Sequence, residues 1–304
     1  MNRRPENLYT LKQLLQVAER ARFAVGAFSP RYTPVIHAIL QAAEVTHSPV
    51  IVQVAQLELR WYQVSIETFA QEFWRHFDQV KPTVPVGLHL DHASDLAIIR
   101  TAAELGFTSV MFDGSGYPLE QNINETRAAA DFAHQNGMSI EGELGRMVAR
   151  DFSESVADKE LYTDPREAAY FVEQTGVDAL AVSVGTAHGM YQVRRPGIDL
   201  ERLKALRIAT PVSLVLHGGA DLPADMVVNA IRLPGGGISK IDFATDMELV
   251  LNKALGLKTR TTEASLHTYP VADLKYGIES AQKVVENKIN QVLISRDHAL
   301  DYHR

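Results

Sequence analysis

The sequence predicts an α/β fold, a (β/α)8 TIM barrel with one extra helix towards its C-terminal end. Eight β-rich runs alternate with amphipathic helical stretches along the 304 residues, which is the order of elements in such a barrel. Most runs are continuously apolar, as in parallel strands that helices cover. We expect one domain over residues 1–304, because these barrels reach about 250 residues or more as one unit. A doubly wound open sheet is the second candidate, but the runs lack a glycine-rich dinucleotide fingerprint.

The expected strands are short, and polar residues stand at the ends of several of them. The runs are Phe23–Phe28, Pro49–Ala55, Val84–Leu90, Ser109–Asp113, Ser139–Leu144, Ala179–Val184, Val212–Leu216 and Ile238–Phe243. In a barrel the C-terminal ends of the strands meet at one rim, where catalytic residues lie. Residues that carry chemistry are therefore expected at these strand ends.

The helices between the strands carry recognisable start and stop signals. Thr10 is the expected N-cap of a helix whose apolar residues recur at i, i+3, i+4 and i+7. Leu119–Gln135 is a similar amphipathic run, and Pro165–Thr175 has Asp164 as N-cap and Gly176 as its end.

Residues 271–295 form one further amphipathic helix, which is surplus to the eight repeats. Its apolar face consists of Ile278, Ala281, Val285, Ile289 and Val292. We expect this helix either to cover the barrel or to dock on a neighbouring subunit.

The composition excludes several classes of protein and of site. The chain has 30 Lys and Arg against 37 Asp and Glu, so a general nucleic-acid-binding surface is not expected. It has no cysteine, so any metal ion must be held by His, Asp or Glu. No apolar run approaches the roughly 20 residues that cross a bilayer, and the polar stretch Met1–Asn7 lacks the apolar core of a signal peptide. We therefore expect a cytoplasmic protein with no membrane partner.

Three histidines stand at matching places: His92, His188 and His217 follow the third, sixth and seventh expected strands. Three imidazoles with an open fourth position form a catalytic zinc site. One such histidine alone is more often a buried structural residue, but three at one rim favour a shared ion. Asp91 directly precedes His92 and is placed to act as a general base, and His89 could support it.

Six stretches carry a resemblance that covers nearly the whole chain in the right order. They are Leu88–His92, Val110–Ser115, Glu143–Gly145, Leu161–Pro165, Gly185–Tyr191 and Leu214–Gly218. In these stretches the chain resembles the class II, metal-dependent fructose-bisphosphate and tagatose-bisphosphate aldolases.

This resemblance implies that His92, His188 and His217 bind Zn²⁺, and that a monovalent cation could bind as well. It implies that Glu143 approaches the metal when it shifts. Asp91 matches the residue that exchanges a proton with the hydroxyl next to the cleaved bond. Zn²⁺ is a Lewis acid that polarises the ketose carbonyl and stabilises the enediolate left after cleavage. The implied reaction is reversible aldol cleavage of a ketose or ketose phosphate.

The substrate-binding positions depart from the family pattern. After the seventh strand the family has a serine followed by glycine, where this chain has Ala220-Asp221; Asp242 stands where the family has Asn, and Glu58 follows the second strand. A phosphate dianion beside uncompensated carboxylates is repelled, which favours a modified or unphosphorylated headgroup. The residues expected to contact the substrate are Gly189, Gly218, Gly219, Asp221, Asp242 and Thr245.

Retained phosphate binding is the alternative for this pocket. The backbone N–H groups of Gly218, Gly219 and the segment near Thr245 could still form an anion-binding nest. Arg31 or Arg60 would then replace the lost positive charge.

The loop after the fifth strand also differs from the family, which has two glycines followed by acidic residues. Here Asp151 is the nearest counterpart of the acid that protonates the enediolate, and Glu154 is the reserve. The alternative is that both are ordinary solvated loop acids.

The favoured function is therefore a zinc-dependent aldolase that acts on a small sugar. A sugar epimerase or isomerase on the same scaffold and a non-catalytic aldolase-like subunit are the alternatives. The surplus helix and the resemblance together favour a homodimer or homotetramer.

Overall fold

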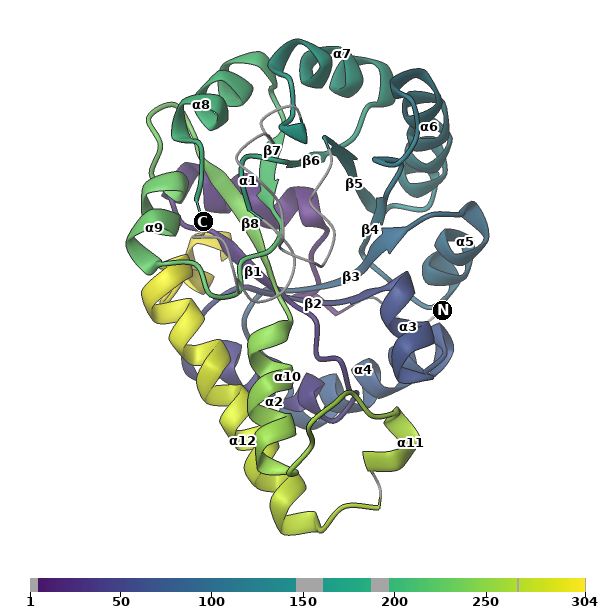
Figure 1. The fold of residues 1–304 in the computed structure, drawn as a ribbon, viewed down its shortest axis with the longest axis vertical. Coiled ribbons are helices and arrows are strands. Elements are labelled where there is room, and N and C mark those ends of the chain that lie inside the picture. Colours follow the sequence, from purple (N-terminus) through teal and green to yellow (C-terminus); the bar gives the residue numbers. More distant parts are fainter. Residues whose placement is uncertain (1–4, 146–160, 187–196, 267, 304) are drawn as a thin grey trace.

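The computed structural model confirms the closed barrel: eight parallel strands are arranged in sequence order and β8 pairs with β1 (Figure 1). The structure describes residues 5–145, 161–186, 197–266 and 268–303. The strands are β1 (Val25–Phe28), β2 (Val50–Ala55), β3 (Val86–Ala93), β4 (Ser109–Phe112), β5 (Ser139–Leu144), β6 (Ala179–Val182), β7 (Ser213–Leu216) and β8 (Ile238–Phe243).

Helices surround this barrel, and every described crossover between consecutive strands contains one (Figure 1). They are α1 (Leu11–Ala21), α2 (Val35–Val45), α3 (Gln56–Tyr62), α4 (Ile66–Val80), α5 (Leu96–Glu104), α6 (Leu119–Gln135), α7 (Pro165–Thr175), α8 (Leu200–Ala209), α9 (Ala224–Ile231), α10 (Thr245–Ala254), α11 (Glu263–Leu266) and α12 (Val271–Asn287). No helix among the described residues is long and apolar enough to cross a membrane.

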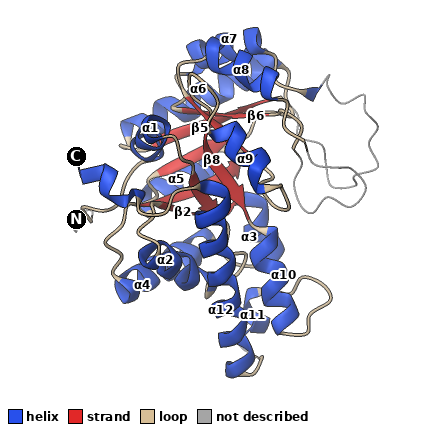
Figure 2. Cartoon of the chain, turned by 90° about the vertical axis from the view of Figure 1, so that its left-hand side faces the viewer, coloured by secondary structure: helices blue, strands red, loops and turns tan. Residues whose placement is uncertain are grey.

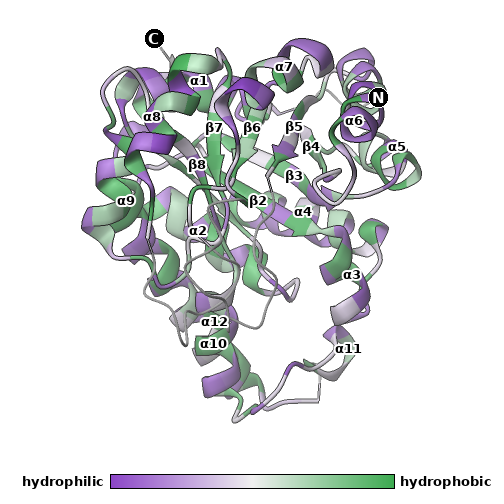
Figure 3. Ribbon diagram, turned by 45° about the horizontal axis from the view of Figure 1, so that its top comes forward, coloured by the Kyte–Doolittle hydropathy of each residue, from purple (hydrophilic) through white to green (hydrophobic). Residues whose placement is uncertain are grey.

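Burial on both faces explains why the strands read as apolar runs. All residues of seven strands are buried, and in β3 only His92 is partly exposed. Figure 3 shows the contrast: the strands are largely hydrophobic, whereas the helices alternate between hydrophobic and hydrophilic residues. Polar residues inside the strands are therefore exceptions to be explained by what they contact.

The expected helix signals are present. Thr10 caps α1 and forms a reciprocal capping box with Gln13. Asp164 accepts hydrogen bonds from the first backbone N–H groups of α7, and Gly176 ends that helix in the left-handed conformation.

The surplus helix α12 packs against α2 and α10, on one side of the barrel (Figure 2). The helix therefore packs on the outer layer of helices, and docking on a neighbouring subunit stays a prediction. The expectation of one continuous helix over 271–295 is wrong in its last turns, because residues Lys288–Leu293 form a π-helical segment, η2. At its end the carbonyl of Leu293 accepts a hydrogen bond from the N–H of Ala24 (3.1 Å). The C-terminal segment is therefore fastened to the start of β1.

Gly237, just before β8, lies so close to the backbone at the end of α9 that no side chain could be accommodated there. An added Cβ would lie 2.0 Å from the carbonyl oxygen of Ala230 and 2.4 Å from that of Ile231. Because both atoms are main chain, we expect Gly237→Ala to lower the free energy of unfolding by about 3 kcal/mol. Gly116 is exposed and an added Cβ there meets nothing within 4 Å, so Gly116→Ala should stay within about 0.5 kcal/mol of wild type. Equal denaturant midpoints for the two variants would contradict this account.

Candidate active site

The end of β3 places two neighbouring functional side chains in one pocket. Successive residues of a strand normally face opposite sides. Here the pairing of β3 with β4 shifts between Leu90 and Ala93, and His92 adopts a left-handed conformation with φ of 44°. As a result both Asp91 and His92 line the pocket at the C-terminal rim of the barrel.

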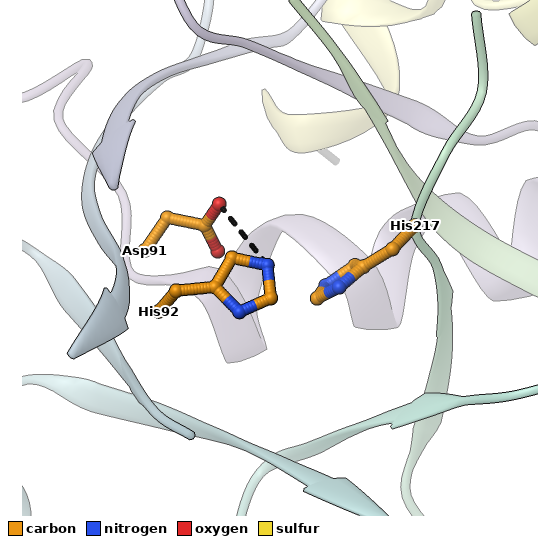
Figure 4. Close-up of side chains that lie close together, drawn as sticks. All are labelled: Asp91, His92 and His217. Carbon is orange, nitrogen blue, oxygen red and sulfur yellow. Dashed lines mark ion pairs between the residues drawn. The ribbon is translucent and has the colours of Figure 1, made fainter. Parts of the chain in front are cut away.

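His217, directly after β7, completes a compact group with these two residues (Figure 4). The ring centroids of His92 and His217 are 4.8 Å apart, with 67° between the ring planes. His92 Nε2 lies 3.9 Å from Asp91 Oδ2. The β5 residue Glu143 faces both imidazoles, since its Oε2 lies 3.7 Å from His92 Nδ1 and 3.6 Å from His217 Nδ1.

Two further carboxylates orient the imidazoles. Asp113 Oδ2 lies 2.7 Å from Nδ1 of His92, and Glu141 Oε1 lies 3.0 Å from Nε2 of His217. Carboxylates in hydrogen-bonding contact with imidazoles are the usual means of fixing the ring orientation of metal-binding histidines. The sequence analysis gave neither acid a role, although Asp113 ends the fourth expected strand and Glu141 lies within the fifth.

Lys240 on β8 is the one fully buried lysine among the described residues. Its Nζ lies 2.9 Å from Glu141 Oε2 and 2.9 Å from Asp242 Oδ1. Lys240 thus neutralises two buried carboxylates.

Gln53 is a site residue that sequence reasoning missed. It is buried in β2, and its Nε2 donates to Asp91 Oδ2 (3.2 Å) and to Asp242 Oδ2 (3.1 Å). The available signal was a single amide within the apolar run Val50–Ala55. Such a residue inside a buried strand needs hydrogen-bond partners, and here they are two functional carboxylates.

Burial and crowding of charge shift the pKa values of the group. Burial raises the pKa of Asp91 to about 6, with Asp242 adding to the shift. Burial also raises the pKa of Glu143 to about 7, with Asp113 as the second cause. Burial disfavours the charged form of His217, but the surrounding carboxylates, Asp242 first, still raise its pKa to about 9. Negative charge is therefore in excess around the imidazoles.

This donor set fits a divalent metal ion. Two groups of described residues place ligand atoms within 4.8 Å of one another: Asp91 with His92 and His217, and His92 with Asp113 and Glu143. Buried oxygens of two of these acids, Asp91 Oδ1 and Glu143 Oε2, accept no hydrogen bond from any described residue. Imidazole and carboxylate ligands suit Zn²⁺ and its neighbours in the first transition row.

Four of the residues singled out from the sequence lie outside the described residues. They are His188, Gly189, Asp151 and Glu154. The roles given to these residues therefore stay predictions.

The expected substrate contacts divide into those at the pocket and those away from it. Gly218, Asp242 and Thr245 line it. Gly219 is not among the lining residues: its N–H donates to the carbonyl of Asp242 (3.1 Å), so this group of the proposed nest is already used. Asp221 is exposed, adopts a left-handed φ of 59° and does not line the pocket either.

The charges at the pocket correct one premise of the sequence analysis. Asp242 was expected to be uncompensated, but Lys240 pairs with it. Glu58 likewise pairs with Arg31, so Arg31 is not a free replacement for a lost phosphate-binding charge. Arg60 is exposed and is not among the residues that line the pocket.

Comparison with known proteins gives matches over nearly the whole chain. The family model described as fructose-bisphosphate aldolase class-II matches residues 9–298. The YdjI aldolase from Escherichia coli K12 is 29% identical, with 96% of this chain and 99% of that chain covered and a TM-score of 0.81. A fructose-bisphosphate aldolase from Campylobacter jejuni is similar in fold at 23% identity, with 95% and 96% covered and a TM-score of 0.75.

Proposed function

Because the chain belongs to the class II fructose-bisphosphate aldolase family, we propose that it is a metal-dependent aldolase that cleaves and forms a carbon–carbon bond in a ketose or ketose phosphate. The observation that carries the proposal is the convergence of His92, His217, Glu143 and Asp91 at the C-terminal rim of the closed barrel. In barrels of this class that rim is where chemistry takes place.

The residues that would hold the ion are His92 and His217, with Glu143 facing both and with His188 as the expected third imidazole. Bound there, Zn²⁺ supplies Lewis-acid polarisation of a carbonyl oxygen. Asp113 and Glu141 hold the two rings in orientation. The pair Lys240–Glu141 keeps the second of these acids ionised and fixed in place.

Asp91 is the residue that moves the proton in this proposal. Gln53 donates to one of its oxygens, Oδ2, and so fixes the plane of the carboxylate. The other oxygen, Oδ1, accepts no hydrogen bond from a described residue. It is therefore available to take the proton from the substrate hydroxyl on the carbon next to the bond that breaks.

The proposal also concerns the headgroup of the substrate. Asp242 lines the pocket as a carboxylate, whereas Ala220 offers no hydroxyl to a phosphate group. These residues support a substrate that is hydroxylated at this position and less strongly charged than a bisphosphate. The partner is thus a small sugar, and we propose a homodimer or homotetramer as the working assembly.

Product analysis tests the reaction itself. Incubation of ketoses and ketose phosphates with the zinc-loaded protein should give two carbonyl fragments, separated by chromatography and identified by mass. A single product with the mass of the substrate would instead support an epimerase or isomerase. No conversion of any substrate, by a protein that carries metal, would contradict both activities.

Metal removal should abolish the reaction. We expect chelation to lower the cleavage rate by about 10³-fold, which corresponds to about 4 kcal/mol of lost transition-state stabilisation. Added Zn²⁺ should restore it. Retention of full activity by protein shown to be free of metal would contradict the proposal.

His217→Ala should lose the metal together with the activity, since it removes one of the two described imidazoles. The measurement is metal content per chain after dialysis. His134→Ala is the matched control, because His134 is half-exposed, does not line the pocket, and has its Nε2 2.9 Å from Asp178 Oδ2. This control should keep the metal content of wild type.

A further inference from the structure

Glu58 is a buried acid of the pocket whose carboxylate is held on both oxygens. One oxygen, Oε1, contacts the guanidinium of Arg31. The other, Oε2, accepts from the hydroxyl of Ser29 and from the backbone N–H of Ala55 (3.3 Å). We call the three donors of Ser29, Arg31 and Ala55 the anion cradle.

The chemistry of the anion cradle is that of a site for a phosphate or carboxylate group. A guanidinium with a hydroxyl and a backbone N–H is the donor set that proteins use for such groups. Here the anion that fills it belongs to the chain. A ligand anion could enter only by displacing Glu58 or by lying beside it.

Among the residues that the structure describes, the cations near the anion cradle are already paired with carboxylates. Arg31 Nε lies 3.8 Å from Glu248 Oε2, so two carboxylates face this one guanidinium. The next cation, Arg260, lies 3.9 Å from Glu248 and donates to the hydroxyl of Tyr62. An anionic group brought to the anion cradle would meet the carboxylate of Glu58, and no described cation is left unpaired there to compensate it.

The position of the anion cradle makes this charge balance relevant to the substrate. Ser29, Arg31, Ala55 and Glu58 line the same pocket as Asp91. A substrate that places one carbon at Asp91 therefore extends towards Glu58 with another part of its chain.

On the basis of the proposed function, we propose that Glu58 is a specificity-determining residue: its carboxylate fills the anion cradle from within the chain and selects sugars that are uncharged at that end. Substrates with a phosphate at that end are disfavoured by like-charge repulsion and by the filled site. A ketose that carries one phosphate at most is then the preferred substrate class.

Steady-state kinetics with fructose 1-phosphate and fructose 1,6-bisphosphate test this proposal, since the two differ by one distal phosphate. Wild type should favour the first by at least about tenfold in kcat/KM. Glu58→Ser should shift that ratio by at least about tenfold towards the bisphosphate, through KM rather than kcat. A wild-type preference for the bisphosphate, or an unchanged ratio in Glu58→Ser, would overturn the proposal.

Two matched variants separate the anion cradle from other roles of this acid. Glu58 is also the third residue of α3, where it accepts the Ala55 N–H as a helix cap, and Gln keeps that cap. Glu58→Gln should therefore keep the helix cap while moving the ratio in the same direction as Glu58→Ser, by a smaller factor. Glu120→Gln removes the charge of an exposed acid of α6 that does not line the pocket and should leave the ratio unchanged.

Calorimetry with inorganic phosphate gives a readout that does not depend on turnover. Glu58→Ser should bind one more phosphate per chain than wild type, and Arg31→Met in the Glu58→Ser background should lose it. No additional phosphate in Glu58→Ser would overturn the role of Glu58. If the additional phosphate binds while neither sugar is cleaved by any variant, the anion cradle stands and the proposed aldolase activity fails.

Discussion

Replacing Asp91 with Asn is expected to lower kcat for aldol cleavage by about 10²–10⁴-fold, the range typical of losing a general base. The amide keeps the shape of the side chain but cannot take the proton from the substrate hydroxyl. Gln53 and Asp242 remain in place, so the pocket should keep its form. Stopped assays of fragment release over a range of substrate concentrations measure this effect.

Metal content distinguishes this role from the other one that the geometry allows. Asp91 also belongs to a group of possible ligands with His92 and His217. If Asp91 transfers the proton, Asp91→Asn keeps the metal content of wild type and KM changes little. A loss of metal in proportion to the loss of activity would contradict the proton-transfer role. Asp131→Asn, at an exposed position of α6, is the control and should leave both quantities unchanged.

Lys240→Met should cost about 3–5 kcal/mol in the free energy of unfolding, the range measured when one partner of a buried ion pair is removed. Lys240 is 0% exposed, and its ammonium group is 2.9 Å from each of two buried carboxylates. Without it the imidazole of His217 would be left as the described cation in contact with both Glu141 and Asp242. Urea denaturation followed by circular dichroism measures the change.

A second substitution tests whether the loss of stability in Lys240→Met comes from the buried carboxylates. Asp242→Asn in the Lys240→Met background removes one of the two carboxylates that lose the ammonium group, so it should recover part of the lost stability. Lys275→Met is the surface control, because this lysine is 76% exposed and lies 3.9 Å from Glu279. It should stay within about 1 kcal/mol of wild type. A Lys240→Met chain as stable as this control would show that the buried charges are balanced in another way.

The barrel was predictable from sequence because its strands are covered on both faces. That burial leaves apolar runs without alternation, and the runs could be counted directly. The caps at Thr10 and Asp164 were predictable for a related reason, since they depend only on residues within one helical turn. The bulge at His92 was not, since nothing in the local sequence requires a left-handed residue there.

The parts of the site that sequence reasoning placed are residues at the ends of strands. Asp91, His92 and His217 were found because the closing of the barrel brings strand ends together whatever lies between them. The charge balance was not found, because Lys240 meets Glu141 from a strand three positions around the barrel. Such a pair depends on side-chain length and on the tilt of the strands, which the order of elements does not give.

The orientation of loop residues was the feature that the sequence predicted least well. Asp221 and Gly219 were both expected to contact substrate, yet one is exposed and the other packs with its N–H on β8. The position of Asp221 depends on its left-handed backbone torsion, and the position of Gly219 depends on a close approach of the loop after β7 to β8. These are properties of the folded loop, and the residue types alone do not specify them.

The pairing of β1 with β8, which closes the barrel, affects folding of the chain during its synthesis. A ribosome delivers Ala24 and β1 before the other strands, and β2 soon follows as the first partner of β1; its second partner, β8, is complete only with Phe243, and Leu293 is made later still. Until then one edge of the growing sheet has no neighbour, and unpaired strand edges in partly folded chains are prone to aggregation. The barrel thus closes only after β8 and the segment up to Leu293 have been made, so slow translation of that segment would prolong the dependence of the chain on chaperones.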